Sequence, residues 1–336
     1  MPILTDHLVL RAWEDADAPE LFALARDPEV GPAAGWTPHA SEAESLEVIR
    51  GVLRRRESYA VVDRRTGELL GAAALKGEGA SRLVAGAGEL ELGYWIGRPF
   101  WGYGYATEAA RALVSHAVLD LGTRRVWGAC HEGNERSRHV LEACGLSLVR
   151  ADRDVSVPAL GDVARDELVF ALDVSRTLYV DADACPVTRE ALDCARKAGI
   201  PVVIAGNTTQ NLERHVRRDD PRSAKEARGG YWVDVLDVSV GADSADFAIV
   251  ERLRPGDVVV TQDIGLASMV LGRDARAISV RGHVFRRETI DAELLVRHEE
   301  KRVRRGGGRT RGPRAFTEAD RRRFSAALGR LLAGKV

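Results

Sequence analysis

The sequence predicts an α/β protein of two unlike domains: a mixed-sheet α+β domain followed by an α/β domain with a mainly parallel sheet. Its 336 residues ordinarily correspond to about two domains. The 45% hydrophobic and 29% charged residues are typical of a globular protein. Strand-like apolar runs alternate with helix-like segments in both halves, and the pattern restarts near residue 177 without internal similarity.

The first half is predicted to combine hairpins with helices. The segment "SEAESLEVIRGVLRRRE" has Ser at its start, acids early and arginines late, as expected for a helix. Two apolar runs around Thr66-Gly67 predict a hairpin. Further strands are expected in "GELELGYWIG", "RRVWGACH" and "DELVFALDV", and helices in "YATEAARALVSHAVLDLG" and "NERSRHVLEACG". The last helix has Asn134 as its N-cap and Gly145 as its stop.

The second half shows the alternation of strands and helices that is typical of βαβ units around a parallel sheet. Strands are expected in "TLYVDADACPV", "IPVVIAGN", "WVDVLDVSVG" and "GDVVVTQD", and helices in "TREALDCARKAG" and "SADFAIVERL". We place the boundary so that the domains are 1–174 and 175–336.

Charge and cysteine usage exclude several classes of protein. The formal net charge of −1 gives no global field for nucleic acid or membrane, although residues 301–314 are strongly basic. The four cysteines have no CxxC spacing, which argues against a zinc knuckle or a disulfide framework. The start of the chain does not resemble a signal peptide, and no apolar run is long enough to span a bilayer. We therefore expect a cytoplasmic protein without a membrane partner.

The most informative stretch of the first half is "GYWIGRPFWGYGYATEAARAL", residues 93–113. A strand ends, a glycine-rich turn follows, and a long helix begins near Ala106. Gly102 and Gly104 lack a Cβ, so the backbone can approach a ligand, and the helix N-terminus favours an anion. Taken alone, the pattern is more typical of an ordinary connection between a strand and a helix.

Together with "ELELGYWI" before it and "NERSRHVLEACGL" after it, this turn resembles the GNAT acetyltransferases, specifically the RimJ/RimL-like branch that acetylates protein N-termini or small amines. The resemblance covers nearly all of residues 3–173. It implies acetyl-CoA as cofactor, with Asn134 on the pantetheine arm. Its pyrophosphate would be held by Trp101, Gly102, Tyr103, Gly104, Tyr105, Ala106 and Thr107. The family usually has Gln or Arg where this chain has Trp101.

Acetyl transfer requires a base, an oxyanion donor and an acid. The acceptor amine must be neutral, and Glu91 is our candidate for the general base, with Glu89 next. Backbone groups at the end of the same strand can stabilise the thioester oxygen. The resemblance implies that Ser137 supplies a proton or hydrogen bond to the departing thiolate. Glu91 is equally compatible with a solvated strand residue, and Asn134 with a simple N-cap.

In the second half, acidic residues gather at predicted strand ends. Asp181 and Asp183 end the first strand, Asp263 follows a later one, and Asp243 and Asp246 lie at the start of a helix. The carboxyl ends of parallel strands meet at one edge of a sheet. Carboxylates that lie close together repel unless a cation or proton is shared, and their oxygen atoms suit Mg²⁺ or Mn²⁺.

Two enzymatic interpretations compete for these aspartates. The pair Asp181 and Asp183 is compatible with a phosphatase of the haloacid-dehalogenase type, as nucleophile and acid/base. However, Cys185 and Pro186 follow directly, and no suitable lysine is present. The alternative is a PIN-type nuclease, in which dispersed acids bind metals that activate water against a phosphodiester.

Residues 177–332 resemble the YaiI/YqxD family of small bacterial proteins, whose fold is PIN-like. The matching segments are "VDADACPV", "GADSADFAI", "GDVVVTQDIGLAS", "RRGGGRTRGPRAF" and "EADRRRFSAAL". The resemblance carries no activity with it, so the nuclease hypothesis rests on the fold and the acids. Cys185 is interpreted as structural.

The basic stretch "KRVRRGGGRTRGPR" is compatible with an arm that contacts the phosphates of RNA or single-stranded nucleic acid. The candidate residues are Arg302, Arg304, Arg305, Arg309 and Arg311. A solvated glycine-rich loop explains the composition equally well. Because no aromatic residues are interleaved, base-specific recognition is not expected.

We therefore expect an acetyl-CoA-dependent N-acetyltransferase, with a protein N-terminus or a small-molecule amine as acceptor, fused to a divalent-metal-dependent nuclease domain. The alternatives for the second domain are a non-catalytic module that binds RNA or a partner, and a DxD phosphatase.

Overall fold

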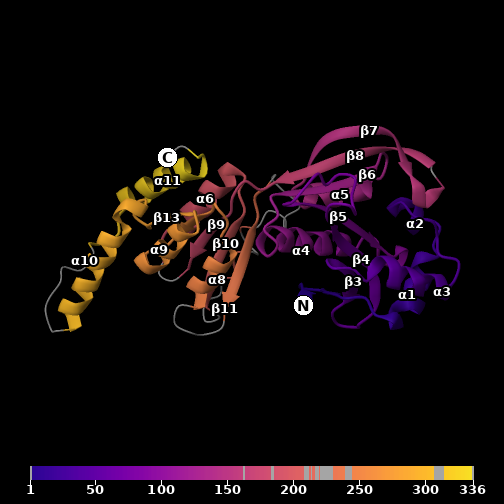
Figure 1. The fold of residues 1–336 in the computed structure, drawn as a ribbon, viewed down its shortest axis with the longest axis horizontal. Helices are drawn as coiled ribbons and strands as arrows, with labels where there is room; N and C mark the ends of the chain where they lie inside the picture. The colour runs from indigo at the N-terminus through magenta and orange to yellow at the C-terminus, as the bar shows by residue number, and fades with distance from the viewer. Residues whose placement is uncertain are drawn as a thin grey trace. The chain divides into compact units, whose positions relative to one another are not determined.

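The computed structural model describes residues 2–161, 163–182, 185–207, 212, 214–215, 219, 230–238, 244–305 and 314–334. The chain divides into two compact units, Met1–Asp173 and Val174–Val336 (Figure 1). Each unit is built on its own sheet, and each is described separately below.

The first unit has a mixed sheet of eight strands in the order β1-β2-β3-β4-β5-β6-β8-β7. All neighbouring strands are antiparallel except β5 and β6, which are parallel. This arrangement confirms the predicted mixed sheet. The strands are β1 (Ile3–Leu4), β2 (Leu8–Arg11), β3 (Ser58–Asp63), β4 (Leu69–Lys76), β5 (Glu89–Ile96), β6 (Arg125–His131), β7 (Ser147–Val157) and β8 (Val163–Asp173).

Helices cover both faces of this sheet. They are α1 (Ala18–Ala25), α2 (Val30–Ala34), α3 (Glu42–Val48), α4 (Tyr105–Leu119) and α5 (Glu135–Ala143), with short helical turns η1 (Asp15–Asp17), η2 (Ile49–Leu53), η3 (Arg98–Phe100) and η4 (Pro158–Leu160). Trp95 packs against the core of α1 and η2, whereas its neighbour Tyr94 contacts α5. Since consecutive strand residues point to opposite faces, α1 and α5 lie on opposite sides of the sheet.

Local sequence signals account for several element boundaries. The hydroxyl of Ser41 accepts a 3.1 Å hydrogen bond from the Glu44 amide and caps α3. Asn134 caps α5, and Gly145 follows that helix with a φ of +88°. The predicted hairpin turns at Gly67, whose φ is +77°. These predictions are confirmed.

Two features of the first unit differ from the sequence prediction. The single helix expected after Ser41 is α3 followed by the π-helical turn η2, so its hydrogen-bond pattern changes at Ile49. The strand β7 was not expected. It is an edge strand that is largely exposed, and therefore lacks the apolar run by which a buried strand is recognised.

Within the described residues, the second unit has a parallel sheet of five strands in the order β11-β10-β9-β12-β13. Every pairing is parallel, which confirms the predicted sheet type. The strands are β9 (Leu178–Asp181), β10 (Val202–Asn207), β11 (Val233–Val238), β12 (Val258–Val260) and β13 (Arg276–Ile278). The helices in the described part of this unit are α6 (Thr188–Ala198), α8 (Ser244–Arg252), α9 (Ile264–Gly272), α10 (Arg287–Arg305) and α11 (Glu318–Leu332).

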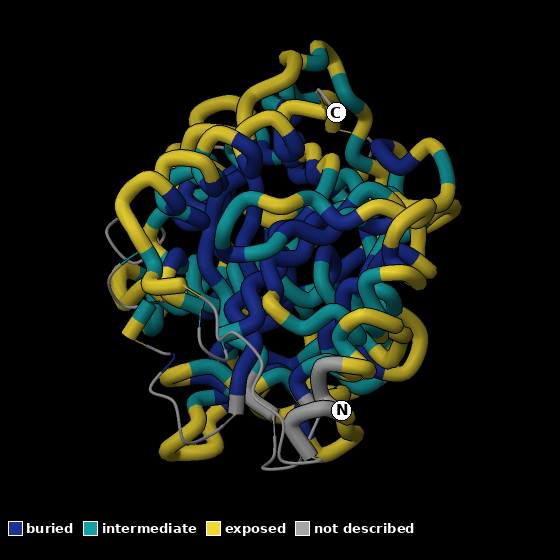
Figure 2. The backbone as a smooth tube through the Cα atoms, turned by 90° about the vertical axis from the view of Figure 1, so that its left-hand side faces the viewer, coloured by how far each residue is buried: buried dark blue, intermediate teal, exposed yellow. Residues whose placement is uncertain are grey.

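The core of this unit explains its apolar strands. Strand residues such as Val180, Ile204 and Val260 pack with Leu328 and Leu331 of α11, and all of them are buried. In Figure 2 the tube is dark blue where residues are buried and yellow where they are exposed. Because a parallel sheet is covered on both faces, its strands read as continuous apolar runs.

Among the helices that the structure describes, none is long and apolar enough to cross a membrane.

Candidate functional site

The parallel strands β5 and β6 separate soon after they begin. They pair only over Glu89–Glu91 and Arg125–Trp127, although β5 continues to Ile96 and β6 to His131. Beyond Glu91, the backbone of β5 on the side of β6 has no strand partner among the described residues. Its polar groups there are available to a ligand that enters between the two strands.

The glycine-rich turn leads from the end of β5 into α4. Gly102 and Gly104 have φ values of +86° and +87°, a backbone region that favours glycine. Gly104 is the N-cap of α4 and makes no side-chain cap hydrogen bond. The amides of Tyr105, Ala106 and Thr107 are therefore the unsatisfied first donors of a helix 15 residues long, which carry partial positive charge.

Space around this turn is open. Apart from the glycine and its neighbours in the chain, no heavy atom of the described residues lies within 4 Å of the position that a Cβ would take on Gly102 or Gly104. Glu108, the acid in the first turn of α4, is held by Thr5 and His7 at 2.6 and 3.0 Å. The turn thus offers backbone donors, while the nearest acid in the helix already has partners.

Trp101, the unusual first residue of the turn, fixes the turn to its surroundings. Its indole Nε1 donates a 2.7 Å hydrogen bond to the carbonyl oxygen of Ile96, at the end of β5. The guanidinium of Arg136, from α5, lies 4.5 Å from the centre of its ring. Trp101 therefore links β5, the turn and α5 through a hydrogen bond and a cation–π contact.

Ser137 and Tyr94 meet across the space between β5 and α5. The Tyr94 hydroxyl lies 3.0 Å from both the carbonyl oxygen and the hydroxyl of Ser137. Burial raises the pKa of the Tyr94 phenol far above its ordinary value, so the phenol stays protonated. Tyr94 was missed by the sequence analysis, since a tyrosine in a strand is most often a packing residue.

Asn134 acts as a helix cap. Its Oδ1 accepts a 3.1 Å hydrogen bond from the Ser137 amide, and its Nδ2 lies 3.5 Å from the carbonyl oxygen of Ala33. The predicted contact with a pantetheine arm is not tested by this geometry. The cap does fix the first turn of α5, and with it the position of Ser137.

The two acidic candidates on β5 have different partners. Glu91 lies 3.1 Å from the ammonium of Lys76, accepts a hydrogen bond from Ser81, and has a side chain that is 15% exposed. Glu89 accepts a 2.9 Å hydrogen bond from the Trp127 indole, which lowers its pKa and makes it a poorer base. Of the two, Glu91 is the better candidate for the general base.

Aromatic side chains lie on the same face of β5 as Glu91. Trp95, four residues further along the strand, contacts Trp36 with ring centres 5.5 Å apart. The ring centres of Trp36 and His39 are 5.3 Å apart. Nδ1 of His39 lies 2.8 Å from the hydroxyl of Ser45. Burial lowers the pKa of His39, which favours its neutral form. Sequence reasoning could not identify this group, because its members come from distant segments.

In the second unit, two predicted metal ligands lie at the carboxyl edge of the sheet. Asp181 ends β9 and is 7% exposed, and Asp263 follows β12. Thr261 lies between them: its hydroxyl donates to Asp181 Oδ2 at 2.7 Å and accepts from the Asp263 amide at 2.9 Å. The two segments therefore lie close together, as predicted, and Thr261 connects them through its hydrogen bonds.

Asp263 has structural partners for both carboxylate oxygens. Oδ1 accepts from the amides of Gly265 and Leu266 at 2.6 and 3.3 Å and caps α9. Oδ2 lies 3.3 Å from the guanidinium of Arg297 in α10. The carboxylate of Asp263 therefore serves as the cap of α9. A metal ion that binds Oδ2 would have to displace the guanidinium of Arg297.

Of the other three predicted metal ligands, the structure describes only Asp246. Asp246 lies in the first turn of α8, while Asp183 and Asp243 are outside the described residues. Among the residues that the structure describes, no group of three His, Cys, Asp or Glu side chains is placed to hold a metal ion. The described residues alone thus do not provide a metal site.

The predicted nucleic-acid residues lie at or beyond the end of α10. Arg302 is exposed and pairs with Glu299 at 3.0 Å. Arg304 and Arg305 belong to α10, and only their backbone is described. Arg309 and Arg311 are outside the described residues.

Comparison with known proteins identifies both halves. Residues 179–334 match the model of an uncharacterised protein family, YaiI/YqxD. A UPF0178 protein of Exiguobacterium sibiricum is 36% identical over 159 residues, which cover 47% of this chain and 98% of that protein. A UPF0178 protein of Clostridium acetobutylicum is 38% identical over 162 residues, which cover 47% of this chain and 99% of that protein. The chain belongs to the YaiI/YqxD family.

The remainder of this YaiI/YqxD-family chain is an acetyltransferase domain: residues 7–147 match the acetyltransferase (GNAT) domain model. Similar solved structures include a GNAT-family acetyltransferase from Bacillus anthracis, with 19% identity, a TM-score of 0.46, and coverage of 52% of this chain and 98% of that one. Another is the ribosomal alpha-N-protein acetyltransferase RimL in complex with coenzyme A, with 18% identity, a TM-score of 0.43, and coverage of 52% and 98%.

The predicted fusion is thereby confirmed. The GNAT match includes Glu91, the glycine-rich turn, Asn134 and Ser137, and the YaiI/YqxD match includes Asp181 and Asp263. The YaiI/YqxD relatives carry no activity in their names, so the site in that domain has to be judged by its own chemistry.

Proposed function

We propose that the acetyltransferase domain transfers the acetyl group of acetyl-CoA to the α-amino group of a protein or peptide. The observation that carries this proposal is the uncapped N-terminus of α4, joined through Gly102 and Gly104 to the strand that separates from β6. The N-terminus of α4 suits a pyrophosphate, and the part of β5 that is not paired with β6 suits an extended thioester arm.

The residues at the turn suit a CoA pyrophosphate. The amides of Tyr105, Ala106 and Thr107 would donate to its oxygen atoms, and the left-handed glycines allow the backbone to approach closely. Trp101 holds the turn against β5, so its backbone donors are positioned before the ligand arrives. This explains how a tryptophan can replace the polar residue that is usual in the family.

Acetyl-CoA supplies an activated thioester, and the acceptor amine must lose its proton to attack it. In the proposal, Glu91 accepts that proton directly or through water, with Lys76 and Ser81 holding its carboxylate in place. A protein α-amino group has an ordinary pKa of about 7.7–8.0, against about 10.4 for a lysine side chain. A carboxylate base therefore favours the α-amine.

Ser137 would donate a hydrogen bond to the departing thiolate. Both contacts of Tyr94 are to Ser137, and a carbonyl oxygen can only accept, so the phenol proton is directed to that carbonyl. The Ser137 hydroxyl can then donate to the phenol oxygen or rotate toward the thiolate. Tyr94 is a positioning residue in this scheme, because it acts through Ser137.

Binding of the cofactor is tested by thermal unfolding of the full chain with and without acetyl-CoA. We expect a rise in Tm that saturates, and a loss of that rise in the double variant Gly102→Val, Gly104→Val. Gly67→Val is the matched control, since Gly67 also has a positive φ, +77°, with open space around it, but belongs to the β3–β4 turn. The absence of a shift in the wild type at saturating acetyl-CoA would reject the proposal.

The acceptor is tested by following thiol release with three amines: a peptide with a free N-terminus, the same peptide N-terminally blocked but containing lysine, and a small alkyl diamine. We expect the highest kcat/KM for the free N-terminus. A preference for the diamine would point to a small-molecule acetyltransferase, and would overturn the choice of acceptor while leaving cofactor binding intact.

For the YaiI/YqxD domain, nuclease activity and a Mg²⁺ or Mn²⁺ site stay predictions. The described residues do not assemble a metal site, so no catalytic step is assigned to them. Cleavage of single-stranded RNA in the presence of Mn²⁺, lost in Asp181→Asn, would support the nuclease. Binding of RNA without cleavage would favour the non-catalytic alternative.

A further inference from the structure

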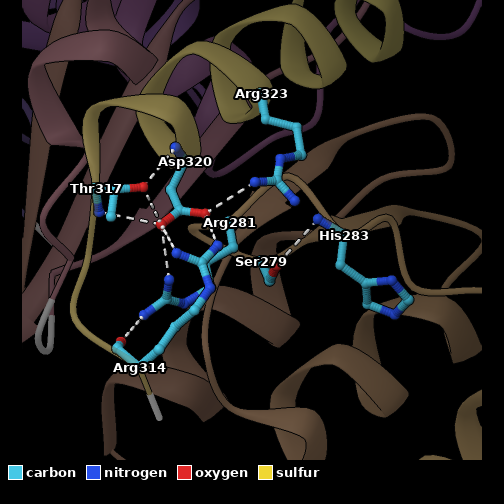
Figure 3. Close-up of polar contacts among 7 residues, drawn as sticks. All are labelled: Ser279, Arg281, His283, Arg314, Thr317, Asp320 and Arg323. Atoms are coloured by element: carbon cyan, nitrogen blue, oxygen red, sulfur yellow. Dashed lines mark hydrogen bonds and ion pairs between the residues drawn. The ribbon is translucent and has the colours of Figure 1, made fainter.

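A fully buried carboxylate, Asp320, organises a group of arginines in the YaiI/YqxD domain. Asp320 lies in the first turn of α11 and is 0% exposed. It accepts hydrogen bonds from Arg281 at 2.8 Å, from both terminal nitrogens of Arg314, and from the amide and hydroxyl of Thr317 at 3.0 and 2.8 Å. Nη2 of Arg323 donates a hydrogen bond to Oδ1 of Asp320 at 3.2 Å (Figure 3).

Positive charge exceeds negative charge in this group. Three guanidinium groups surround one carboxylate, and Asp320 is the acid with which each pairs in the described part of the chain. Burial raises the pKa of Asp320, but the hydrogen bonds from Arg314 and Thr317 outweigh it and hold the pKa well below its usual range. The carboxylate is ionised, and the group keeps a net charge of two positive units (three minus one).

The excess charge faces solvent. The side chains of Arg314 and Arg323 are 55% and 59% exposed, and that of Arg281 is 29% exposed, whereas Asp320 is covered. Arg323 directs a single nitrogen, Nη2, toward Asp320. A guanidinium has further N–H donors in its plane, so this side chain can bind a second anion while it keeps the first contact.

Backbone packing holds the arginines in place. The turn of residues 279–283 closes with a 2.8 Å hydrogen bond from the Ser279 amide to the His283 carbonyl. Gly282 at its tip has a φ of +82°, and a Cβ there would lie 3.0 Å from the backbone of Arg323. Arg281 also donates to the Arg314 carbonyl at 2.6 Å and lies over the Phe316 ring at 5.2 Å. A ligand would thus find guanidinium groups that are already ordered.

Arg281 lies at the carboxyl edge of the sheet, next to the edge strand β13. Arg281 follows the carboxyl end of β13, which pairs with β12, and β12 pairs with β9. Since all these strands are parallel, Arg281 lies at the same sheet edge as Thr261 and Asp181. In open parallel sheets, ligands bind outside the carboxyl ends of the strands.

We propose that Arg281, Arg314 and Arg323 form a phosphate-binding site at the carboxyl edge of the YaiI/YqxD sheet. Paired guanidinium groups match the oxygen geometry of a phosphate, and the buried Asp320 fixes them without reaching the ligand. Two sources supply this chemistry: the phosphodiester of an RNA strand and a free phosphate monoester. All three arginines belong to the YaiI/YqxD domain, and this proposal does not rest on the proposed acetyl transfer.

The test uses the full chain in phosphate-free buffer without acetyl-CoA. Binding of a fluorescein-labelled oligoadenylate RNA of about 12 nucleotides is measured by anisotropy over a range of salt concentrations. In parallel, thermal unfolding is measured with inorganic phosphate and with AMP. Arg323→Gln removes one guanidinium and leaves Arg281 and Arg314 on Asp320. Arg322→Gln is the matched control, because it removes the same charge from an exposed neighbouring position on α11.

We expect Arg323→Gln to weaken binding of the responding probe by roughly tenfold or more, and Arg322→Gln to change it by less than about twofold. Unfolding temperatures should show that both variants are folded. An RNA response identifies a phosphodiester ligand; a response to phosphate or AMP alone identifies a monoester. If no probe binds the wild type, or if both variants weaken binding equally, the proposed site is wrong.

Discussion

The hydroxyl of Tyr94 lies 3.0 Å from both the carbonyl oxygen and the hydroxyl of Ser137. Tyr94 lies in β5, beyond the last residue of that strand that pairs with β6, and Ser137 lies in α5. The contact holds Ser137 close to the strand that would hold the thioester, while its hydroxyl stays able to rotate. It also makes the two side chains a unit, so their contributions to catalysis are not independent.

Tyr94→Phe is expected to lower kcat by roughly tenfold to a hundredfold, because Ser137 loses the hydrogen bond that positions it. Ser137→Ala should lower kcat at least as much, and the double variant no further. The KM for acetyl-CoA should stay nearly unchanged. Steady-state kinetics by thiol release measure all three.

Tyr59→Phe is the control for this experiment. Tyr59 is also a partly buried tyrosine, with a 2.7 Å hydrogen bond to Glu57, but it lies at the start of β3. Its loss should leave kcat unchanged. Additive effects of Tyr94→Phe and Ser137→Ala would contradict the proposed coupling.

A second prediction concerns the contact between Trp101 and Arg136. Arg136→Gln removes a cation–π contact worth about 0.5–2 kcal/mol, which should raise the Kd for coenzyme A by roughly two- to thirtyfold. Trp101→Leu removes the same contact and also the hydrogen bond to Ile96, so its effect should be larger. Isothermal titration calorimetry with coenzyme A measures both.

Arg138→Gln provides the comparison for Arg136. Arg138 lies in the same helix and pairs with Glu142 at 3.0 Å. The substitution removes one positive charge from α5 without touching Trp101, so the Kd should change little. If Arg138→Gln weakens binding as much as Arg136→Gln does, general attraction to the cofactor phosphates is the better explanation.

The sequence predicted those features that depend on residues close together in the chain. Ser41 and Asn134 cap the helices that follow them, and Gly145 ends one, because caps act on their own neighbours. The glycine-rich turn before α4 was predicted for the same reason. The apolar strands of the second domain identified a parallel sheet, because such strands are buried on both faces.

Contacts between distant segments could not be predicted in this way. Tyr94 and Ser137 are 43 positions apart, and Arg281 and Asp320 are 39 apart. Thr261, between Asp181 and Asp263, has no feature that separates it from any other residue at a strand end. The edge strand β7 escaped notice for a different reason, since exposure removes the periodic pattern that marks a strand.

A third prediction concerns stability against pH through His116. This side chain, in α4, lies 2.8 Å from Asp120 and 2.9 Å from Glu57. The hydrogen bond to Asp120, with that to Glu57, raises the pKa of His116 despite its partial burial. A raised pKa in the folded state means that the stabilisation is fully present below the unfolded value of about 6.5. It is lost as the pH rises through the folded value.

Thermal unfolding of the wild type and of His116→Gln should therefore differ most at pH 5.5–6 and converge as the pH is raised above the folded pKa. Asp120→Asn should reduce this difference, since Asp120 supplies the main contribution. A difference in Tm between wild type and His116→Gln that stays constant from pH 5.5 to 9 would show that packing, and not charge, is what His116 provides.

The last prediction separates two roles of Asp263. As the cap of α9, its Oδ1 accepts from the Gly265 and Leu266 amides, and asparagine can replace it there, whereas alanine cannot. Asp263→Ala should lower the free energy of unfolding by about 1 kcal/mol in EDTA, and Asp263→Asn by only a few tenths. Urea unfolding measures both values.

A metal ligand responds differently to the same two substitutions. If Asp263 and Asp181 bind Mn²⁺, the rise in Tm on adding Mn²⁺ should be lost in Asp263→Asn, although the cap is kept, because an amide is a much weaker ligand for a hard cation than a carboxylate. Asp181→Asn should lose the rise as well. A wild type whose Tm does not respond to Mn²⁺ would refute the metal site, and Asp263→Asn as unstable as Asp263→Ala would refute the cap. Since Arg297 already neutralises Asp263, removing that arginine should strengthen Mn²⁺ binding if the carboxylate is a ligand.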